Sequence, residues 1–135
     1  MPAGRTGPVG AVRGILTFDG NTTDVAQARG FVDSTLRHHP DRETAVLLTS
    51  EFVTNGIVHG TGAITVVVLE TESGVRIEVT DAGSGKLPRM RESGVDAEGG
   101  RGLFLVDHLA SRWDHVRTDA GLTAWFELDT TAPAG

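Results

Sequence analysis

The chain has no cysteine and only one lysine among its 135 residues. Without cysteine, disulfide bonds, thiolate-bound zinc and iron–sulfur clusters are excluded, which leaves histidine and carboxylates as metal ligands. No apolar run approaches the roughly 20 residues that span a bilayer, so no membrane segment is expected. The N-terminus also lacks the apolar core of a secretory signal, and the cytoplasm is therefore the expected location.

Positive charge is scarce as well. The net charge of −6 argues against binding to nucleic acid, because that affinity comes mainly from cations that neutralise phosphates. A length of 135 residues suits one compact domain. We expect a flexible N-terminal tail over residues 1–13, a folded domain over 14–129 and a disordered C-terminal tail over 130–135.

The order of apolar patterns predicts an α+β fold. Periodicity and turn residues predict strands over 14–18, 63–72, 75–80, 113–118 and 122–129, and helices over 24–38, 41–59 and 103–110. Thr22 or Thr23 is expected to cap the first helix, and Asp41 the second. Successive hairpins favour a two-layer sandwich, with a mixed, mostly antiparallel sheet and the helices on one face.

The second predicted helix carries a polar stripe on an otherwise apolar segment, LLTSEFVTNGIVHG. Glu51, Asn55 and His59 are spaced four apart, so their side chains share one side of the helix and border its apolar face. Such a stripe is either a polar edge of the core or the wall of a binding site.

A glycine-rich loop over residues 81–102 is the second unusual feature. DAGSG directly follows a strand, and GGRG directly precedes a helix, whose unpaired N–H groups could cradle phosphate. The glycines could equally mark a turn and a helix cap. Asp81 ends the strand, where its carboxylate could accept a hydrogen bond from the amine of a planar base or could serve as an Asx-turn cap.

Several common motifs do not fit this loop. A Walker A motif needs glycine at position 80, which is Thr80, and a dinucleotide fingerprint needs glycine at position 88, which is Pro88. Ser84 lacks the flanking glycines of a nucleophile elbow, and the chain contains no H-E-x-x-H zinc motif.

Together these features resemble the histidine-kinase-like ATP-binding fold, a Bergerat-type sandwich found in DNA gyrase, sensor histidine kinases, a heat-shock chaperone and a mismatch-repair ATPase. The likeness covers roughly residues 22–128. Three boxes match in order, and Thr123 resembles a threonine on the last strand that helps to hold adenine. The matching residues are Glu51 and Asn55 in the N box, Asp81, Gly83 and Gly85 in the G1 box, and Gly99, Gly100 and Gly102 in the G2 box.

Within that superfamily, SEFVTN and the short lid resemble the anti-sigma factor serine/threonine kinases. The resemblance implies ATP and Mg²⁺ as cofactors, with Glu51 as general base, Asn55 as magnesium ligand and Asp81 as reader of the adenine amine. It also implies that nucleotide is held by Gly83, Gly85 and the backbone of Gly99, Gly100, Arg101, Gly102 and Leu103, with residues 86–98 as a lid. The Arg101 side chain lies between the G2 glycines, where it could approach the γ-phosphate or be a solvated charge. A sigma factor and an antagonist protein are the implied partners, and the family also dimerises.

Two other functions stay open at this point. One is a non-catalytic ATP-binding module that sequesters a protein partner, with Glu51 purely structural. The other is the catalytic half of a sensor histidine kinase, which the sequence favours less because no helix with a phosphoacceptor histidine precedes the domain. Gly56, where the family usually has alanine, is a departure expected to loosen the second helix by roughly 0.5–1 kcal/mol.

Overall fold

The computed structural model describes residues 10–59, 62–82, 105–119 and 121–130. These residues form two long helices, one short helix over residues 105–109, and five strands. The elements in chain order are β1 (Val12–Phe18), α1 (Asp24–Thr35), α2 (Arg42–His59), β2 (Ile64–Glu70), β3 (Gly74–Asp81), β4 (Arg112–Thr118) and β5 (Gly121–Asp129).

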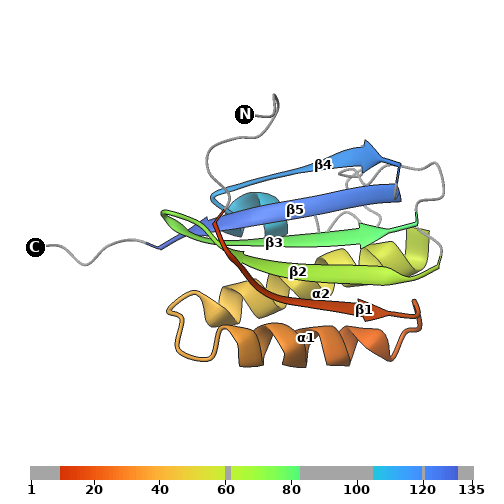
Figure 1. The fold of residues 1–135 in the computed structure, drawn as a ribbon, viewed down its shortest axis with the longest axis horizontal. Helices are drawn as coiled ribbons and strands as arrows, with labels where there is room; N and C mark the ends of the chain where they lie inside the picture. The colour runs from red at the N-terminus through yellow and green to blue at the C-terminus, as the bar shows by residue number, and fades with distance from the viewer. Residues whose placement is uncertain (1–9, 60–61, 83–104, 120, 131–135) are drawn as a thin grey trace, which may run out of the picture.

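The strands form one sheet in the order β1-β2-β3-β5-β4 (Figure 1). All four strand pairings described are antiparallel, which confirms the predicted α+β fold with a mostly antiparallel sheet; the described strands include no parallel pair. The β3–β5 register places Asp81 opposite Leu122, and the β2–β3 register places Ile64 opposite Asp81. The end of β3 is thus flanked by an apolar residue on each neighbouring strand.

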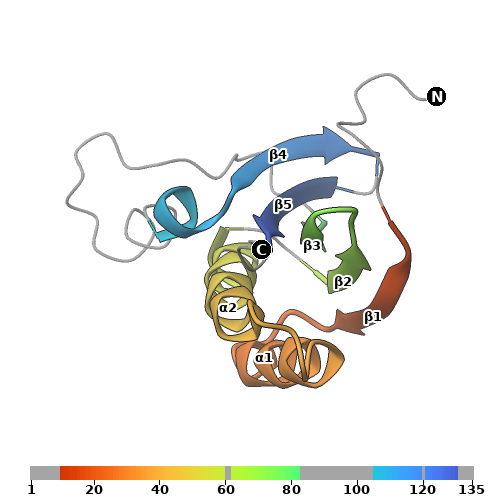
Figure 2. The same cartoon turned by 90° about the vertical axis from the view of Figure 1, so that its left-hand side faces the viewer.

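The helices cover one face of this sheet (Figure 2). Side chains alternate between the two faces of a strand, and on β3 Val75, Ile77 and Val79 are buried while the residues between them are half-buried. The buried set meets Leu48, Phe52 and other apolar residues of α2 in a single core. α2 therefore lies across the middle strands, and its position fixes which of its side chains can flank the core.

The start of α1 differs from the expectation. Thr23 occupies the N-cap position but makes no side-chain capping hydrogen bond. The Asp24 carboxylate instead accepts hydrogen bonds from the backbone N–H groups of Gly20 and Asn21, both at 2.8 Å. A side chain inside the helix therefore reaches back to hold the preceding turn.

The other boundaries agree closely with the predicted ones. β1 begins at Val12, so two residues assigned to the N-terminal tail belong to the sheet. α1 ends at Thr35, three residues earlier than predicted.

None of the helices in the described ranges has the length and apolarity needed to cross a bilayer.

Candidate functional site

The two flanks of α2 have different neighbours. α1 packs along one flank, where a groove of about 380 Å³ is lined by Arg29, Asp33, Glu43, Val46, Leu47 and Ser50. Glu51 and Asn55 lie about 100–140° around the helix axis from Ser50, since each residue turns a helix by roughly 100°. They therefore occupy the flank that faces away from α1.

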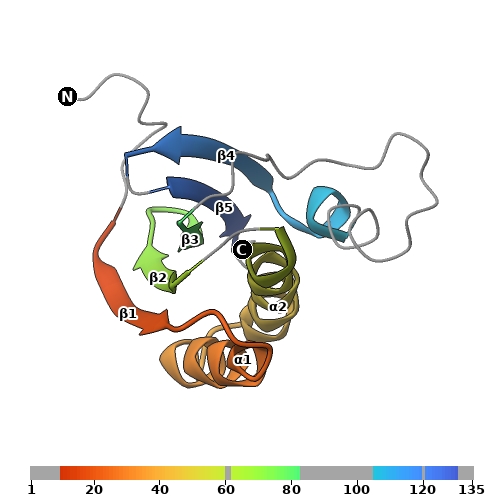
Figure 3. The ribbon, with the colours of Figure 1, turned by 90° about the vertical axis from the view of Figure 1, so that its right-hand side faces the viewer.

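An aromatic cluster lies beneath that flank. Phe52 contacts Phe126 of β5 at a ring-centroid distance of 5.5 Å and Trp113 of β4 at 6.4 Å. Trp113 donates its Nε1–H to Asp107 in the short helix over residues 105–109, at 3.1 Å. The short helix and α1 lie on different sides of α2 (Figure 3), so Glu51 and Asn55 are on the side of the short helix.

Glu51 and Asn55 are both half-buried, as a stripe at the edge of the core should be. The Asn55 side-chain nitrogen Nδ2 is buried, and among the described residues it has no hydrogen-bond acceptor. Leaving a buried amide N–H unpaired costs about 1–3 kcal/mol. A group outside the described residues, such as a ligand oxygen, would remove that cost.

Asp81 lies under α2 at the end of β3, and its residue is 9% exposed. Gly56 passes directly over it: a Cβ added at Gly56 would lie 3.4 Å from Asp81 Oδ2. The glycine therefore leaves a methyl-sized space beside this carboxylate. Cross-strand from Asp81, Leu122 presents an apolar side chain that is buried against the same end of the sheet.

Thr123 lies on the other face of the sheet. Its hydroxyl is 2.7 Å from that of its cross-strand partner Thr80, the residue before Asp81. Because successive residues of a strand point to opposite faces, Thr80 and Thr123 point away from the helices while Asp81 points toward them. The adenine contact predicted for Thr123 stays a prediction that this geometry disfavours, and Leu122 is the β5 residue beside Asp81.

The sequence did not single out Leu122. Alternation along β5 marks a strand, but only the register with β3 shows which of its residues faces Asp81. The remaining predicted site residues, Gly83, Gly85, Gly99, Gly100, Arg101, Gly102 and Leu103, lie outside the described residues, as does the side chain of His59.

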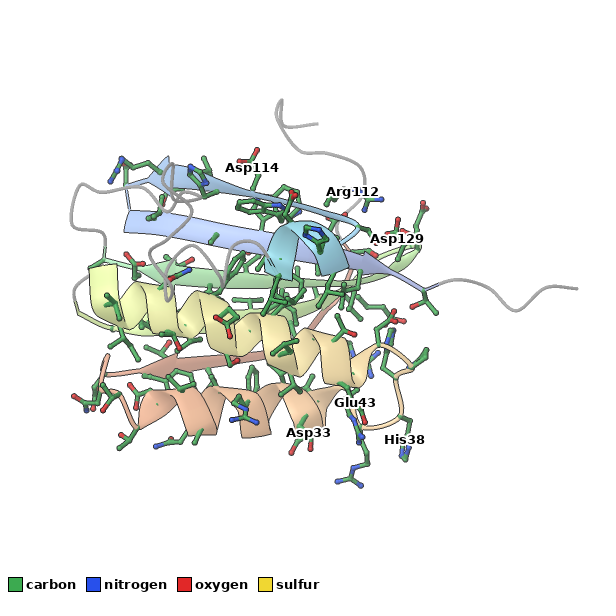
Figure 4. The ribbon with its side chains drawn as sticks, turned by 180° about the vertical axis from the view of Figure 1, so that it is seen from behind. Asp33, His38, Glu43, Arg112, Asp114 and Asp129 are labelled. Carbon is green, nitrogen blue, oxygen red and sulfur yellow. The ribbon has the colours of Figure 1, made fainter. Side chains whose placement is uncertain are left out.

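A charged cluster lies at the opposite end of β5. Arg112 hydrogen-bonds both Glu127 and Asp129, and Figure 4 shows the Arg112 and Asp129 side chains together. These bonds raise the pKa of Arg112, and the bond from Arg112 lowers the pKa of Asp129 despite its partial burial. Asp129 and Leu122 are seven positions apart on β5, a distance of about 23 Å along the strand. This cluster therefore stabilises the sheet and is not part of the site.

Comparison with known proteins identifies the family of this domain. The model of the histidine kinase-like ATPase domain family matches residues 18–127, from the end of β1 to β5. The chain belongs to this family. The histidine kinase-like ATPase domain therefore accounts for nearly all of the folded residues. Glu51, Asn55 and Asp81, which the sequence predicts to be site residues, lie within the matched segment.

A solved structure with the same fold is the crystal structure of the RsbU and RsbW domains of Rv1364c from Mycobacterium tuberculosis. It matches 90% of this chain with a TM-score of 0.64 and 24% sequence identity. This chain spans only 34% of that protein, so the likeness concerns the fold. No curated protein matches the chain.

Proposed function

We propose that this domain is a Mg-ATP-dependent protein serine/threonine kinase that acts as an anti-sigma factor and phosphorylates an antagonist of that factor. Family membership supports nucleotide binding, and the similarity to a structure that contains an RsbW domain supports the regulatory setting. The observation that carries the proposal is the buried Asn55 amide, which has no acceptor in the described part of the chain and lies one helical turn after Glu51.

Asn55 fits a site for magnesium and phosphate. An amide oxygen is a hard ligand that Mg²⁺ accepts, and Mg²⁺ usually takes only one or two protein ligands beside phosphates and water. The carbonyl oxygen of Asn55 could serve as such a ligand while its buried Nδ2 donates to a phosphate oxygen. When bound, Mg-ATP supplies the phosphoryl group and the charge neutralisation that its transfer needs.

Asp81 fits the recognition of adenine. A carboxylate only accepts hydrogen bonds when ionised, so it pairs with the exocyclic amine of adenine and repels the carbonyl oxygen that guanine carries there. Leu122 and Ile64, opposite it on the neighbouring strands, are buried, and the Asp81 residue is itself only 9% exposed. The protein is therefore expected to prefer ATP to GTP.

Glu51 is suited to accept the proton of the attacking hydroxyl. It is half-buried on the same flank as Asn55, one turn away, so both side chains can reach one bound substrate. As the hydroxyl oxygen of the partner's serine or threonine forms its bond to the γ-phosphorus, the bond to the ADP oxygen breaks and the hydroxyl proton passes to the Glu51 carboxylate.

The proposed partners are a sigma factor and its antagonist protein, with a second copy of this chain as a dimer partner. Two surfaces could receive them. The groove between α1 and α2 exposes Leu47, and the edge strand β1 exposes Val12 and Ile15. Exposed apolar side chains beside an unpaired strand edge are typical of surfaces that pair with another chain.

The test is a phosphorylation assay with labelled ATP and candidate antagonists, using Glu51→Gln and the wild-type protein. Loss of a general base costs 10²–10⁴-fold, so the variant should transfer label at least about 100-fold more slowly while it binds ATP with nearly unchanged affinity. Glu72→Gln, an exposed carboxylate in the β2–β3 turn, is the matched control and should behave as wild type.

Two results would contradict the proposal in different ways. Label transfer by Glu51→Gln at the wild-type rate would remove Glu51 from the chemistry. Magnesium-dependent ATP binding by the wild type without transfer to any antagonist would favour the non-catalytic module that sequesters a partner.

A further inference from the structure

Asp24 is a buried carboxylate far from Glu51 and Asn55 in the sequence. It is 5% exposed, yet it sits at the first residue of α1 next to a surface turn. Its Oδ2 accepts the two backbone N–H groups of Gly20 and Asn21, and its own N–H donates to the Asn21 carbonyl at 2.8 Å. Hydrogen bonds to an ionised carboxylate are among the stronger ones in proteins, so the β1–α1 turn is tightly held.

This turn contacts the segment that leads into β2. Gly20 has a φ of +98°, and a Cβ there would overlap the carbonyl group of Gly62. Gly62 also has a positive φ, +73°, and a Cβ added there would lie 3.4 Å from the Cβ of Ala82. The turn that Asp24 holds thus lies against Gly62, and Gly62 in turn lies near Ala82, the residue directly after Asp81.

A third glycine packs on the same point from β5. Gly121, with a φ of +134°, lies so close to the Asp81 carbonyl oxygen and to Ala82 that no side chain fits. The backbone that follows β3 is therefore held between Gly62 and Gly121. Figure 1 shows the start of α1 and the ends of β1, β3 and α2 at the same end of the molecule.

From this chain of contacts we infer that Asp24 is a positioning residue for base recognition. By fixing the β1–α1 turn against Gly62, it fixes Gly62 against Ala82 and so the place of the Asp81 carboxylate. Asp24 itself does not touch the nucleotide. The inference rests on the proposed function, because it gives Asp81 the role of distinguishing adenine from guanine.

Three variants test this inference through nucleotide selectivity. Asp24→Ala removes the acceptor, Asp24→Asn keeps an acceptor oxygen without the charge, and Gly20→Ala disturbs the far end of the turn by adding a methyl group against Gly62. The control is Asp19→Asn, an exposed carboxylate in the same connection. Titration calorimetry with Mg-ATP and with Mg-GTP gives the ratio of the two affinities, and circular dichroism gives the melting temperature.

The ratio distinguishes positioning from mere stabilisation. A displaced carboxylate weakens its hydrogen bond to the adenine amine, and loss of a hydrogen bond to a charged group lowers affinity by roughly tenfold or more, so the ATP affinity should fall by about tenfold. GTP does not use this hydrogen bond, so the preference for ATP should shrink by a similar factor in Asp24→Ala and Gly20→Ala, less in Asp24→Asn, and not in Asp19→Asn.

An unchanged ATP-to-GTP ratio in the folded Asp24 and Gly20 variants, whatever their melting temperatures, would overturn the inference, because Asp24 would then serve only folding. If Asp24→Ala does not fold, Asp24→Asn and Gly20→Ala decide the question. A wild-type protein that binds neither nucleotide would overturn the proposed function itself, and it is recognised before any variant is compared.

Discussion

Replacing Gly56 by alanine tests how α2 fits over Asp81. The residue lies inside α2, where alanine is favoured over glycine by about 0.8–1.0 kcal/mol. The added methyl group would lie 3.4 Å from Asp81 Oδ2 and 3.8 Å from Asp81 Cβ, which are ordinary van der Waals distances. Among the described residues, only the Cδ1 atom of Ile64, at 3.2 Å, is closer than most real contacts.

The gain in helix propensity should exceed the cost of the closer contact with Ile64. Ile64 Cδ1 is the far end of a flexible side chain, so a few tenths of an ångström of movement relieve the contact. Gly56→Ala should therefore raise the free energy of unfolding by about 0.5–1 kcal/mol, somewhat less than the full propensity difference. For a domain of this length that gain corresponds to an increase in Tm of about 2–6 °C.

The assay is chemical denaturation combined with thermal melting, and the chain offers a matched control. Gly30 lies inside α1, and a Cβ there would meet no heavy atom of the residues that the structure describes within 4 Å, so Gly30→Ala measures helix propensity alone. The difference between the two alanine variants is the cost of filling the space over Asp81. In an Ile64→Val background, which lacks the Cδ1 atom, Gly56→Ala should give the same gain as Gly30→Ala.

A Gly56→Ala protein less stable than wild type, with Gly30→Ala stabilised as expected, would refute this reasoning. It would mean that the site cannot move aside for one methyl group. A loss that persists in the Ile64→Val background would place the conflict at Asp81 and show that its carboxylate requires the space above it.

Two further predictions concern the sheet. Hydrogen bonds from Arg112 and then Ser73 lower the pKa of Asp129 below its ordinary value of 3.8. The ionised carboxylate therefore stabilises the fold at pH values above 3.8, and this stabilisation is lost as the pH falls through the lowered pKa. Asp129→Asn should therefore lower the free energy of unfolding at pH 7, by no more than about 1 kcal/mol for such a partly exposed pair. It should also flatten the acid side of a plot of unfolding free energy against pH. A curve identical to that of the wild type would contradict this prediction. Thr123→Val should lower the free energy of unfolding by about 0.5–1.5 kcal/mol, because the hydrogen bond to Thr80 is lost, and it should change the ATP affinity by no more than about twofold. An affinity about tenfold weaker, measured by calorimetry, would show that Thr123 does contact adenine.

The local sequence pattern was sufficient to predict the strands and helices of this fold. Alternation over residues 75–80 and helical spacing over 41–59 each have a period that only one type of secondary structure satisfies, and β3 and α2 were found at nearly those bounds. The half-buried flank of Glu51 and Asn55 also follows from helix geometry alone, because residues four apart lie on one side whatever the helix packs against.

The cap of α1 shows where local reasoning is insufficient. Thr22 and Thr23 have the chemistry of a cap, but Asp24 holds the turn, because that turn packs against Gly62, some 40 residues along the chain. The burial that strengthens the Asp24 hydrogen bonds depends on contacts that no sequence window contains.

The sequence by itself determined the five strands, the helices and the candidate groups Glu51, Asn55 and Asp81, since periodicity and residue chemistry act over a few positions. The tertiary structure decided what each group faces. Strand register set Leu122 beside Asp81 and turned Thr123 to the far face, and the packing of α2 on the sheet put the bare backbone of Gly56 over the carboxylate. A shift of one residue in register reverses the face of every side chain, and only the assembled sheet fixes that register.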